Sequence, residues 1–243
     1  MLKEDKMKIF CIGYNKTGTT SLYHSITKLG FNGDVNTFVE GELQLKNIIK
    51  GNTKQVLHWV SGLNEIEVFK DIPFSLPNFW KLLYEKYPNA IYVLSERDSS
   101  EQWYNSISNF HRIGFKLSKE PTWEEVSKIG YSYINLPERI IEFIPAHPIP
   151  SGTLCGMISD YLKYTFGEEH LPYDKENMIR SYELHNKEVK EFFKNKDNFI
   201  SVNVSNDSDY LKLCNYLNVE PKSNKFLEHY VNKRLKKHII INS

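Results

Sequence analysis

The chain has 243 residues, with 31 lysines and arginines against 30 aspartates and glutamates, and a formal net charge of +1. Such a balance argues against the strong overall field of general nucleic-acid or membrane-surface binders. No run of about 18 apolar residues is present, and residues 1–8 are too polar for a signal peptide. We therefore expect one domain over residues 1–243, with no nucleic-acid partner and no membrane partner.

The three cysteines, Cys11, Cys155 and Cys214, are odd in number and far apart. This spacing argues against a disulfide framework and against a zinc site. A reducing, cytoplasmic setting fits such a chain best, and we expect no metal.

A glycine-bounded turn near the start carries a lysine and a cluster of hydroxyls. Residues 8–12 are an apolar run typical of a buried parallel strand, and apolar residues recur at helical spacing from Leu22 to Leu29. The turn between them, residues 13–21, reads GYNKTGTTS. The order strand, turn, helix directs free backbone N–H groups and a positive helix dipole toward an anion at residues 18–21. The alternative is that Gly18 makes a tight turn and the hydroxyls only cap the helix.

The position of the lysine bears on the kind of phosphate site. Gly13 and Gly18 stand five apart, as in ATP-binding loops, but Thr19 occupies the position where those loops have lysine. The lysine lies inside the turn, at Lys16. This arrangement disfavours an ATP site, whose lysine reaches the phosphates from the first turn of the helix.

Two candidate bases follow along the chain. Residues 56–60 predict a short strand or the wall of a pocket, and His58 within them has an unperturbed pKa near neutrality, although a lone histidine among apolar neighbours is more often a packed core group. Residues 67–70 predict a second strand, with Asp71 at its carboxyl end, where ligands of open α/β sheets bind. Asp71 either caps the next segment or serves as a base facing the glycine turn.

A second anion site is predicted after a central strand at residues 90–94. Arg97 follows that strand, and Ser106 lies on the helix after it. A guanidinium supplies a bidentate fork and a hydroxyl one further donor, which together suit a phosphate.

These features resemble the sulfotransferases that use 3′-phosphoadenosine 5′-phosphosulfate (PAPS). In that family a lysine followed by Gly-Thr-Thr forms the 5′-phosphosulfate loop, and an arginine after a strand, followed by a serine, binds the 3′-phosphate. Ser106 lies nine positions after Arg97, whereas the family spacing is commonly eight, which falls on Asn105. Further segments resemble the small single-domain members: Asp71-Ile72-Pro73, Tyr87-Pro88, Arg97-Asp98, Trp103-Tyr104 and Tyr182-Glu183-Leu184-His185-Asn186.

The resemblance implies an α/β fold of three layers, P-loop-like, with a mainly parallel central sheet flanked by helices and a helical insertion at about residues 112–170. It implies an enzyme that moves a sulfuryl group from PAPS to a hydroxyl or amine of a small-molecule acceptor, without metal. The expected catalytic residues are Lys16, Asp71 and His58. The expected nucleotide-binding residues are Asn15, Lys16, Thr17, Gly18, Thr19, Thr20, Ser21, Arg97 and Ser106.

The later chain predicts helices at residues 123–133, 136–144, 151–166 and 174–195, and a strand at 199–204. On the last of these helices we expect His185 to be a buried histidine bonded to backbone. The basic run from Lys233 to Lys237 either closes over the nucleotide or forms a solvated tail, the more usual state of such a run.

Two other functions remain open from the sequence. One is a P-loop kinase of small molecules, in which Asp71 binds Mg²⁺ or acts as base. The other is a nucleotide-binding module without transfer activity. For a transferase, the many aromatic residues between Trp59 and Phe115 favour an apolar or phenolic acceptor, although a protein core uses the same residue types.

Overall fold

A computed structural model describes residues 6–34, 36–129 and 156–227. Its sheet has the order β2-β1-β3-β4, and every neighbouring pair is parallel. The four strands are β1 (Ile9–Cys11), β2 (Val68–Phe69), β3 (Ile91–Glu96) and β4 (Phe199–Asn203). The predicted α/β fold with a parallel central sheet is confirmed.

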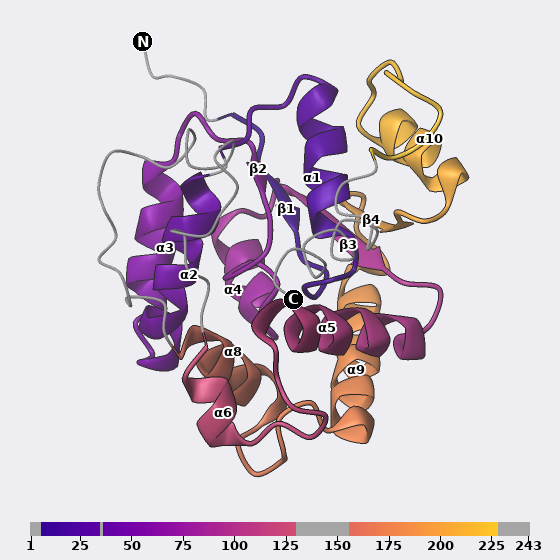
Figure 1. The fold of residues 1–243 in the computed structure, drawn as a ribbon. Helices are drawn as coiled ribbons and strands as arrows, with labels where there is room; N and C mark the ends of the chain where they lie inside the picture. Colours follow the sequence, from indigo (N-terminus) through magenta and orange to yellow (C-terminus); the bar gives the residue numbers. More distant parts are fainter. Residues whose placement is uncertain (1–5, 35, 130–155, 228–243) are drawn as a thin grey trace.

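Helices lie on both sides of the sheet (Figure 1). They are α1 (Thr19–Lys28), α2 (Asn36–Ile49), α3 (Thr53–Gly62), α4 (Phe79–Lys86), α5 (Ser100–Phe115), α6 (Trp123–Ser127), α8 (Met157–Phe166), α9 (Lys175–Phe193) and α10 (Asp207–Tyr216). Among the described residues, none of these helices is long and apolar enough to cross a membrane.

The three layers follow from the alternation of side chains along the strands. Phe10 and Ile12 point into a core cluster shared with α2 to α9, whereas Ile9 and Cys11 point into a second cluster shared with α1 and α10. Successive residues of a strand face opposite sides of a sheet, so a continuous apolar run such as residues 9–12 is buried on both faces.

The strand predicted at residues 56–60 is wrong, because these residues belong to α3. Val56 and Val60 are fully buried while His58 between them is exposed. Burial that repeats every four residues is the pattern of a helix with one face on the core. His58, the second candidate base, therefore lies on the exposed side of a helix.

Other predictions for the later chain agree with the described elements. α9 and β4 lie where a long helix and a late strand were expected. His185 is buried and its Nε2 lies 2.9 Å from the Ile12 carbonyl oxygen, which confirms the prediction of a histidine bonded to backbone. The predicted helix at 136–144, the start of the one at 151–166, Cys155 and the basic run from Lys233 to Lys237 lie outside the described residues.

Candidate functional site

The candidate site lies where three neighbouring strands end. β2, β1 and β3 are parallel and adjacent, so their carboxyl ends meet at one edge of the sheet. The segments that follow them carry Lys70 and Asp71, the glycine loop (residues 13–21), and Arg97. Residues distant in sequence are thereby brought together at the edge where open α/β sheets bind ligands.

Two glycines are required by close packing of the glycine loop. A Cβ atom on Gly13 would lie 2.4 Å from both the carbonyl oxygen and the Oγ of Ser95. Gly18 has a φ of 93°, and a Cβ atom there would lie 2.1 Å from Cγ2 of Val204. Any larger side chain at either position would displace the loop from β3 or from the segment after β4.

Hydrogen bonds hold the middle of the loop. The Thr17 hydroxyl is buried, donates to the Tyr14 carbonyl oxygen at 2.7 Å, and shares a 2.6 Å hydrogen bond with Ser95 Oγ. Asn15 Oδ1 accepts from Ser75 Oγ at 2.6 Å, and the Asn15 carbonyl oxygen accepts from Trp103 Nε1 at 3.0 Å. The side chains of Asn15 and Thr17 therefore fix the loop to its surroundings.

The helix α1 begins at this loop with an open N-terminus. Gly18 is its N-cap residue and supplies no side-chain acceptor, whereas Ser99 caps α5 and Asp174 caps α9 through their side chains. The backbone N–H groups of the first helical turn point out of the N-terminal end of α1, toward the glycine loop. These donors and the positive end of the helix dipole suit a bound phosphate.

Lys16 is the cation of the loop. Its φ of 72° lies in the left-handed region, and its Nζ lies 3.5 Å from the centroid of the Phe110 ring. Burial lowers the pKa of Lys16 to about 8, an effect opposed by the carboxylate of Asp71 and reinforced by Arg97 and Lys70. Lys16 is thus a partly desolvated amine that remains largely protonated at neutral pH.

Asp71 is tied directly to the glycine loop. The side chain is only 6% exposed, and its Oδ1 accepts a hydrogen bond of 2.6 Å from the Thr19 hydroxyl. Its Oδ2 forms an ion pair with Lys70 Nζ. The predicted base at the end of β2 therefore faces the start of α1, with each carboxylate oxygen in contact with a donor.

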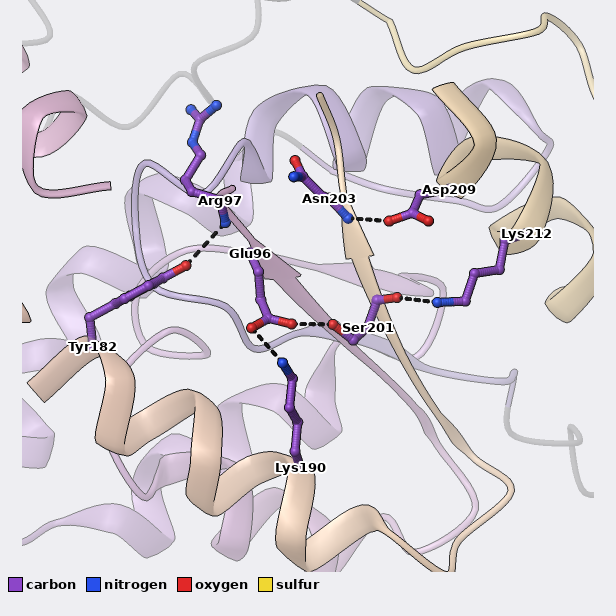
Figure 2. A network of polar contacts seen from close by, with 8 residues as sticks. All are labelled: Glu96, Arg97, Tyr182, Lys190, Ser201, Asn203, Asp209 and Lys212. Carbon is purple, nitrogen blue, oxygen red and sulfur yellow. Dashed lines mark hydrogen bonds and ion pairs between the residues drawn. The ribbon is translucent and has the colours of Figure 1, made fainter. Parts of the chain in front are cut away.

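Arg97 links the glycine loop to the end of β3. Its Nε donates to the Lys16 carbonyl oxygen at 2.9 Å, and its backbone N–H donates to the Tyr182 hydroxyl at 3.0 Å. Figure 2 shows the guanidinium extending away from Tyr182 and Glu96. Within the described part of the chain, the Arg97 side chain hydrogen-bonds through Nε alone, which leaves its outer nitrogens for a ligand.

A polar network braces the strand end that carries Arg97 (Figure 2). The Glu96 carboxylate pairs with Lys190 Nζ of α9 at 2.7 Å and accepts a hydrogen bond from Ser201 Oγ of β4. Lys212 Nζ of α10 donates to the Ser201 carbonyl oxygen at 2.8 Å. Glu96, the last residue of β3, is thus tied directly to α9 and, through Ser201, to α10.

An open groove of about 610 Å³ lies on the α9 side of this network. Its walls include Glu96, Arg97, Tyr182 and the exposed lysines and glutamates of α9, so it carries charges of both signs. No residue of the glycine loop is among the described residues that line it. The groove is therefore adjacent to Arg97 but separate from Lys16.

Ser106 lies on the side of α5 that faces the glycine loop. It follows Trp103, which donates to Asn15, by three residues and precedes Phe110, which contacts Lys16, by four. Residues three and four apart share a helix face. Asn105, the position given by the usual family spacing, is exposed.

His58 lies apart from these residues. It is exposed on α3, and no contact within the described part of the chain joins it to the glycine loop. The structure thus brings together every other predicted site residue at the sheet edge or on α5.

Sequence reasoning missed Lys70, Phe110 and His111. Lys70 ends the predicted strand and pairs with Asp71. A lysine at the edge of the sheet where ligands bind could have been predicted as a site residue. His111 is buried on α5, where burial first and the charge of Lys16 second lower its pKa to about 3. Its only sequence signal is the spacing Trp103, Ile107, His111, which looks like an ordinary buried helix face.

The described residues contain no group of three or more histidine, cysteine, aspartate or glutamate side chains that could hold a metal ion.

Comparison with known proteins gives the family. A family model described as a sulfotransferase domain matches residues 8–230. A search of curated proteins finds no match. The matched span includes the glycine loop, Asp71, Arg97 and α5, and covers most of the chain. The chain belongs to the sulfotransferase domain family.

Proposed function

We propose that this protein transfers a sulfuryl group from PAPS to a hydroxyl or amine of a small-molecule acceptor and releases adenosine 3′,5′-bisphosphate. The observation that carries the proposal is the hydrogen bond of 2.9 Å between Arg97 Nε and the Lys16 carbonyl oxygen. It holds the Arg97 guanidinium against the backbone of the residue that carries the loop's own cation, so both cationic residues lie at one sheet edge. A nucleotide phosphorylated at both its 3′ and 5′ positions needs two such anion sites.

The residues of the site fit this donor. The N-terminus of α1, whose N-cap Gly18 supplies no side-chain acceptor, would hold the 5′-phosphate through backbone N–H groups of the first turn, such as that of Thr20. The outer nitrogens of Arg97 and the hydroxyl of Ser106 would hold the 3′-phosphate. The hydrogen bonds of Thr17 with Ser95 and of Asn15 with Ser75 hold the loop in its conformation.

The chemistry requires charge stabilisation more than covalent work by the protein. As the acceptor attacks sulfur, the bond from sulfur to the 5′-phosphate oxygen breaks, and negative charge grows on that oxygen. Lys16 supplies the positive charge, and its partial burial strengthens the interaction because little water screens it. The Thr19 hydroxyl remains bonded to Asp71, which anchors the first turn of α1 during the step.

The acceptor is proposed to be an apolar or phenolic small molecule. The Phe110 ring contacts the Lys16 amine and therefore borders the place where the sulfuryl group would lie. An aromatic wall at that place favours an apolar acceptor body.

The acceptor must also lose a proton, and the two bases predicted from sequence are testable. Asp71 lies beside the loop, whereas His58 is exposed on α3. The sulfuryl-transfer rates of Asp71→Asn and His58→Ala measure how much each residue contributes as a base. Full activity in both variants would remove both residues as bases.

Nucleotide binding tests the proposal most simply. Thermal shifts are measured with adenosine 3′,5′-bisphosphate without metal, with adenosine 5′-monophosphate, and with ATP and Mg²⁺. We expect the bisphosphate to stabilise most, because it alone engages both anion sites. Stabilisation by ATP and Mg²⁺ alone would indicate a kinase and refute the proposal. Binding of the bisphosphate without transfer from PAPS to any acceptor would indicate a binding module.

A further inference from the structure

The ring of Phe110 covers the amine of the loop lysine. Its centroid lies 3.5 Å from Lys16 Nζ, and the next shortest lysine-to-ring distance among the described residues is 4.1 Å. Within the same residues the Lys16 amine has no hydrogen bond and no ion pair. Of the groups that the structure describes, the Phe110 ring alone therefore holds the end of this side chain in place.

The backbone of Lys16 is held as well. Its φ of 72° is a left-handed conformation, which costs free energy for a residue that carries a Cβ atom. Such strain persists where the surrounding structure holds it, and it clusters at functional sites. The hydrogen bond of 2.9 Å from Arg97 Nε to the Lys16 carbonyl oxygen fixes the backbone at this residue. Lys16 is thus held at both ends, by Arg97 at its backbone and by Phe110 at its amine.

The helix α5 places this ring at a defined distance from the second anion site. Trp103, whose Nε1 donates to the Asn15 carbonyl oxygen at 3.0 Å, shares a helix face with Ser106 and Phe110. With a rise of about 1.5 Å per residue, Phe110 lies about 6 Å beyond Ser106 along the helix axis. In the proposed function Ser106 serves the 3′-phosphate, so the Phe110 ring borders the end of the donor from which sulfur is transferred.

The ring acts on the amine in two opposing ways. Its electron-rich face attracts the cation, which favours the charged form. It also keeps water from the amine, which disfavours the charged form. Burial lowers the pKa of Lys16 to about 8, so the exclusion of water is the larger effect. A poorly hydrated amine interacts strongly with a developing negative charge, because little water screens it.

We propose that Phe110 is a positioning residue, whose ring holds the Lys16 amine for the leaving phosphate oxygen and shields the sulfuryl group of the donor from water. The inference rests on the proposed sulfuryl transfer. In that transfer the acceptor oxygen bonds to sulfur, the bond from sulfur to the 5′-phosphate oxygen breaks, and its electron pair stays on the phosphate. In the competing hydrolysis a water oxygen bonds to sulfur instead, its proton goes to solvent, and free sulfate is released.

Three substitutions separate the two effects of the ring. Phe110→Leu keeps an apolar side chain but removes the aromatic face, Phe110→Ala opens the amine to water, and Phe110→Tyr keeps the face. Phe192→Leu is the matched control. Phe192 is half-buried on α9, and its ring centroid lies 4.1 Å from Lys196 Nζ, away from the glycine loop.

The experiment has two readouts. The first is kcat/KM for PAPS from pH 6 to 10, measured with an acceptor that does not ionise in this range. The second is sulfate released from PAPS without acceptor, relative to transfer with acceptor. Thermal shift with adenosine 3′,5′-bisphosphate checks that each variant is folded and binds nucleotide.

The two substitutions should move the pH dependence in opposite directions. We expect kcat/KM of the wild type to fall as pH rises through about 8, that of Phe110→Leu to fall at lower pH, and that of Phe110→Ala at higher pH, toward 10.5. At pH 7 the leucine variant should lose about 10-fold in kcat/KM. Relative sulfate release should rise in Phe110→Ala alone. Phe110→Tyr and Phe192→Leu should match the wild type in both readouts.

A purely structural ring would lower activity without moving the pH dependence. An unchanged pH dependence in both Phe110→Leu and Phe110→Ala would therefore overturn the inference, and so would a shift of both in the same direction. If Phe110→Ala does not fold, the leucine and tyrosine variants decide, and equal pH profiles for these two would overturn it.

The proposed function can fail separately from this inference. Absence of transfer from PAPS to any acceptor by the wild type would refute the proposed function. The pH dependence of bisphosphate affinity in the same variants would then still measure the effect of Phe110 on Lys16, and the same opposite shifts are expected there.

Discussion

The amine of Lys16 rests on the face of the Phe110 ring, 3.5 Å from its centroid. This contact joins the glycine loop to α5, the helix that also carries Ser106 and His111. An aromatic face attracts a cation and excludes water from it. The contact therefore keeps Lys16 both charged and poorly solvated, which is the state in which it stabilises a leaving phosphate best.

The first prediction concerns the pH dependence of transfer. Lys16 must be protonated, and burial lowers its pKa to about 8, so kcat/KM should fall as pH rises through about 8. A bound anion favours the protonated amine, so the fall in kcat should occur at higher pH. Initial rates from pH 6 to 10 test this. A kcat/KM that stays level up to pH 9.5 would contradict the role of Lys16 as a cation.

The second prediction concerns stability. The pKa of Lys16 in the folded protein, about 8, lies below its ordinary value of 10.5, so the charged amine destabilises the fold below pH 8. This cost diminishes as pH rises from 8 toward 10.5. Lys16→Met should therefore stabilise the protein at pH 7, on the order of 1–3 kcal/mol.

Urea unfolding of Lys16→Met at pH 7 and pH 10 measures this effect. Lys54→Met, at an exposed position of α3, is the control and should change little. A loss of stability in Lys16→Met at pH 7 would show that the amine has compensating contacts in the folded state.

The third prediction concerns the packing of the glycine loop. Gly13→Ala would place a methyl group 2.4 Å from the Ser95 carbonyl oxygen, so either the loop or β3 must shift. We expect a destabilisation of about 1–3 kcal/mol and loss of bisphosphate binding. Gly62→Ala is the control, because its added methyl meets no atom within 4 Å beyond the neighbouring residues and the helix backbone. Equal behaviour of the two variants by thermal shift would be inconsistent with this packing.

The fourth prediction concerns the second anion site. Arg97→Lys removes the planar fork and the Nε contact with the Lys16 carbonyl oxygen. Affinity for adenosine 3′,5′-bisphosphate should fall by about 10- to 100-fold, as for loss of a charged hydrogen bond, while affinity for adenosine 5′-monophosphate changes less. Calorimetric titration with both nucleotides checks this. A similar loss for both would mean that Arg97 only supports the loop.

Much of the fold was predictable because its signals are local. The apolar run at residues 9–12, the glycines of the loop and the polar cap of α9 each act within a few residues, and each predicted its element. The segment at 56–60 misled because its apolar run is too short to separate a strand from a helix. The burial of both Val56 and Val60, four residues apart, in the core identifies the helix.

The residues of the site that lie in local sequence motifs were predictable. The glycine loop, Asp71 and Arg97 are predictable because each places a charged or phosphate-binding residue type directly after a predicted strand. The contact between Tyr173 and His111 joins positions 62 residues apart and has no local signal. The same holds for Thr19 and Asp71, which lie 52 residues apart and whose hydrogen bond depends on the adjacency of β1 and β2.

Sulfuryl transfer by Lys16→Ala tests the central claim most directly. Transfer from PAPS is measured with the acceptor on which the wild type is most active, beside the melting temperature of both proteins. We predict that the variant remains folded and loses about 10³-fold in kcat, because the leaving phosphate loses its only cation from the loop. A folded Lys16→Ala protein with more than about a tenth of wild-type turnover would contradict the account.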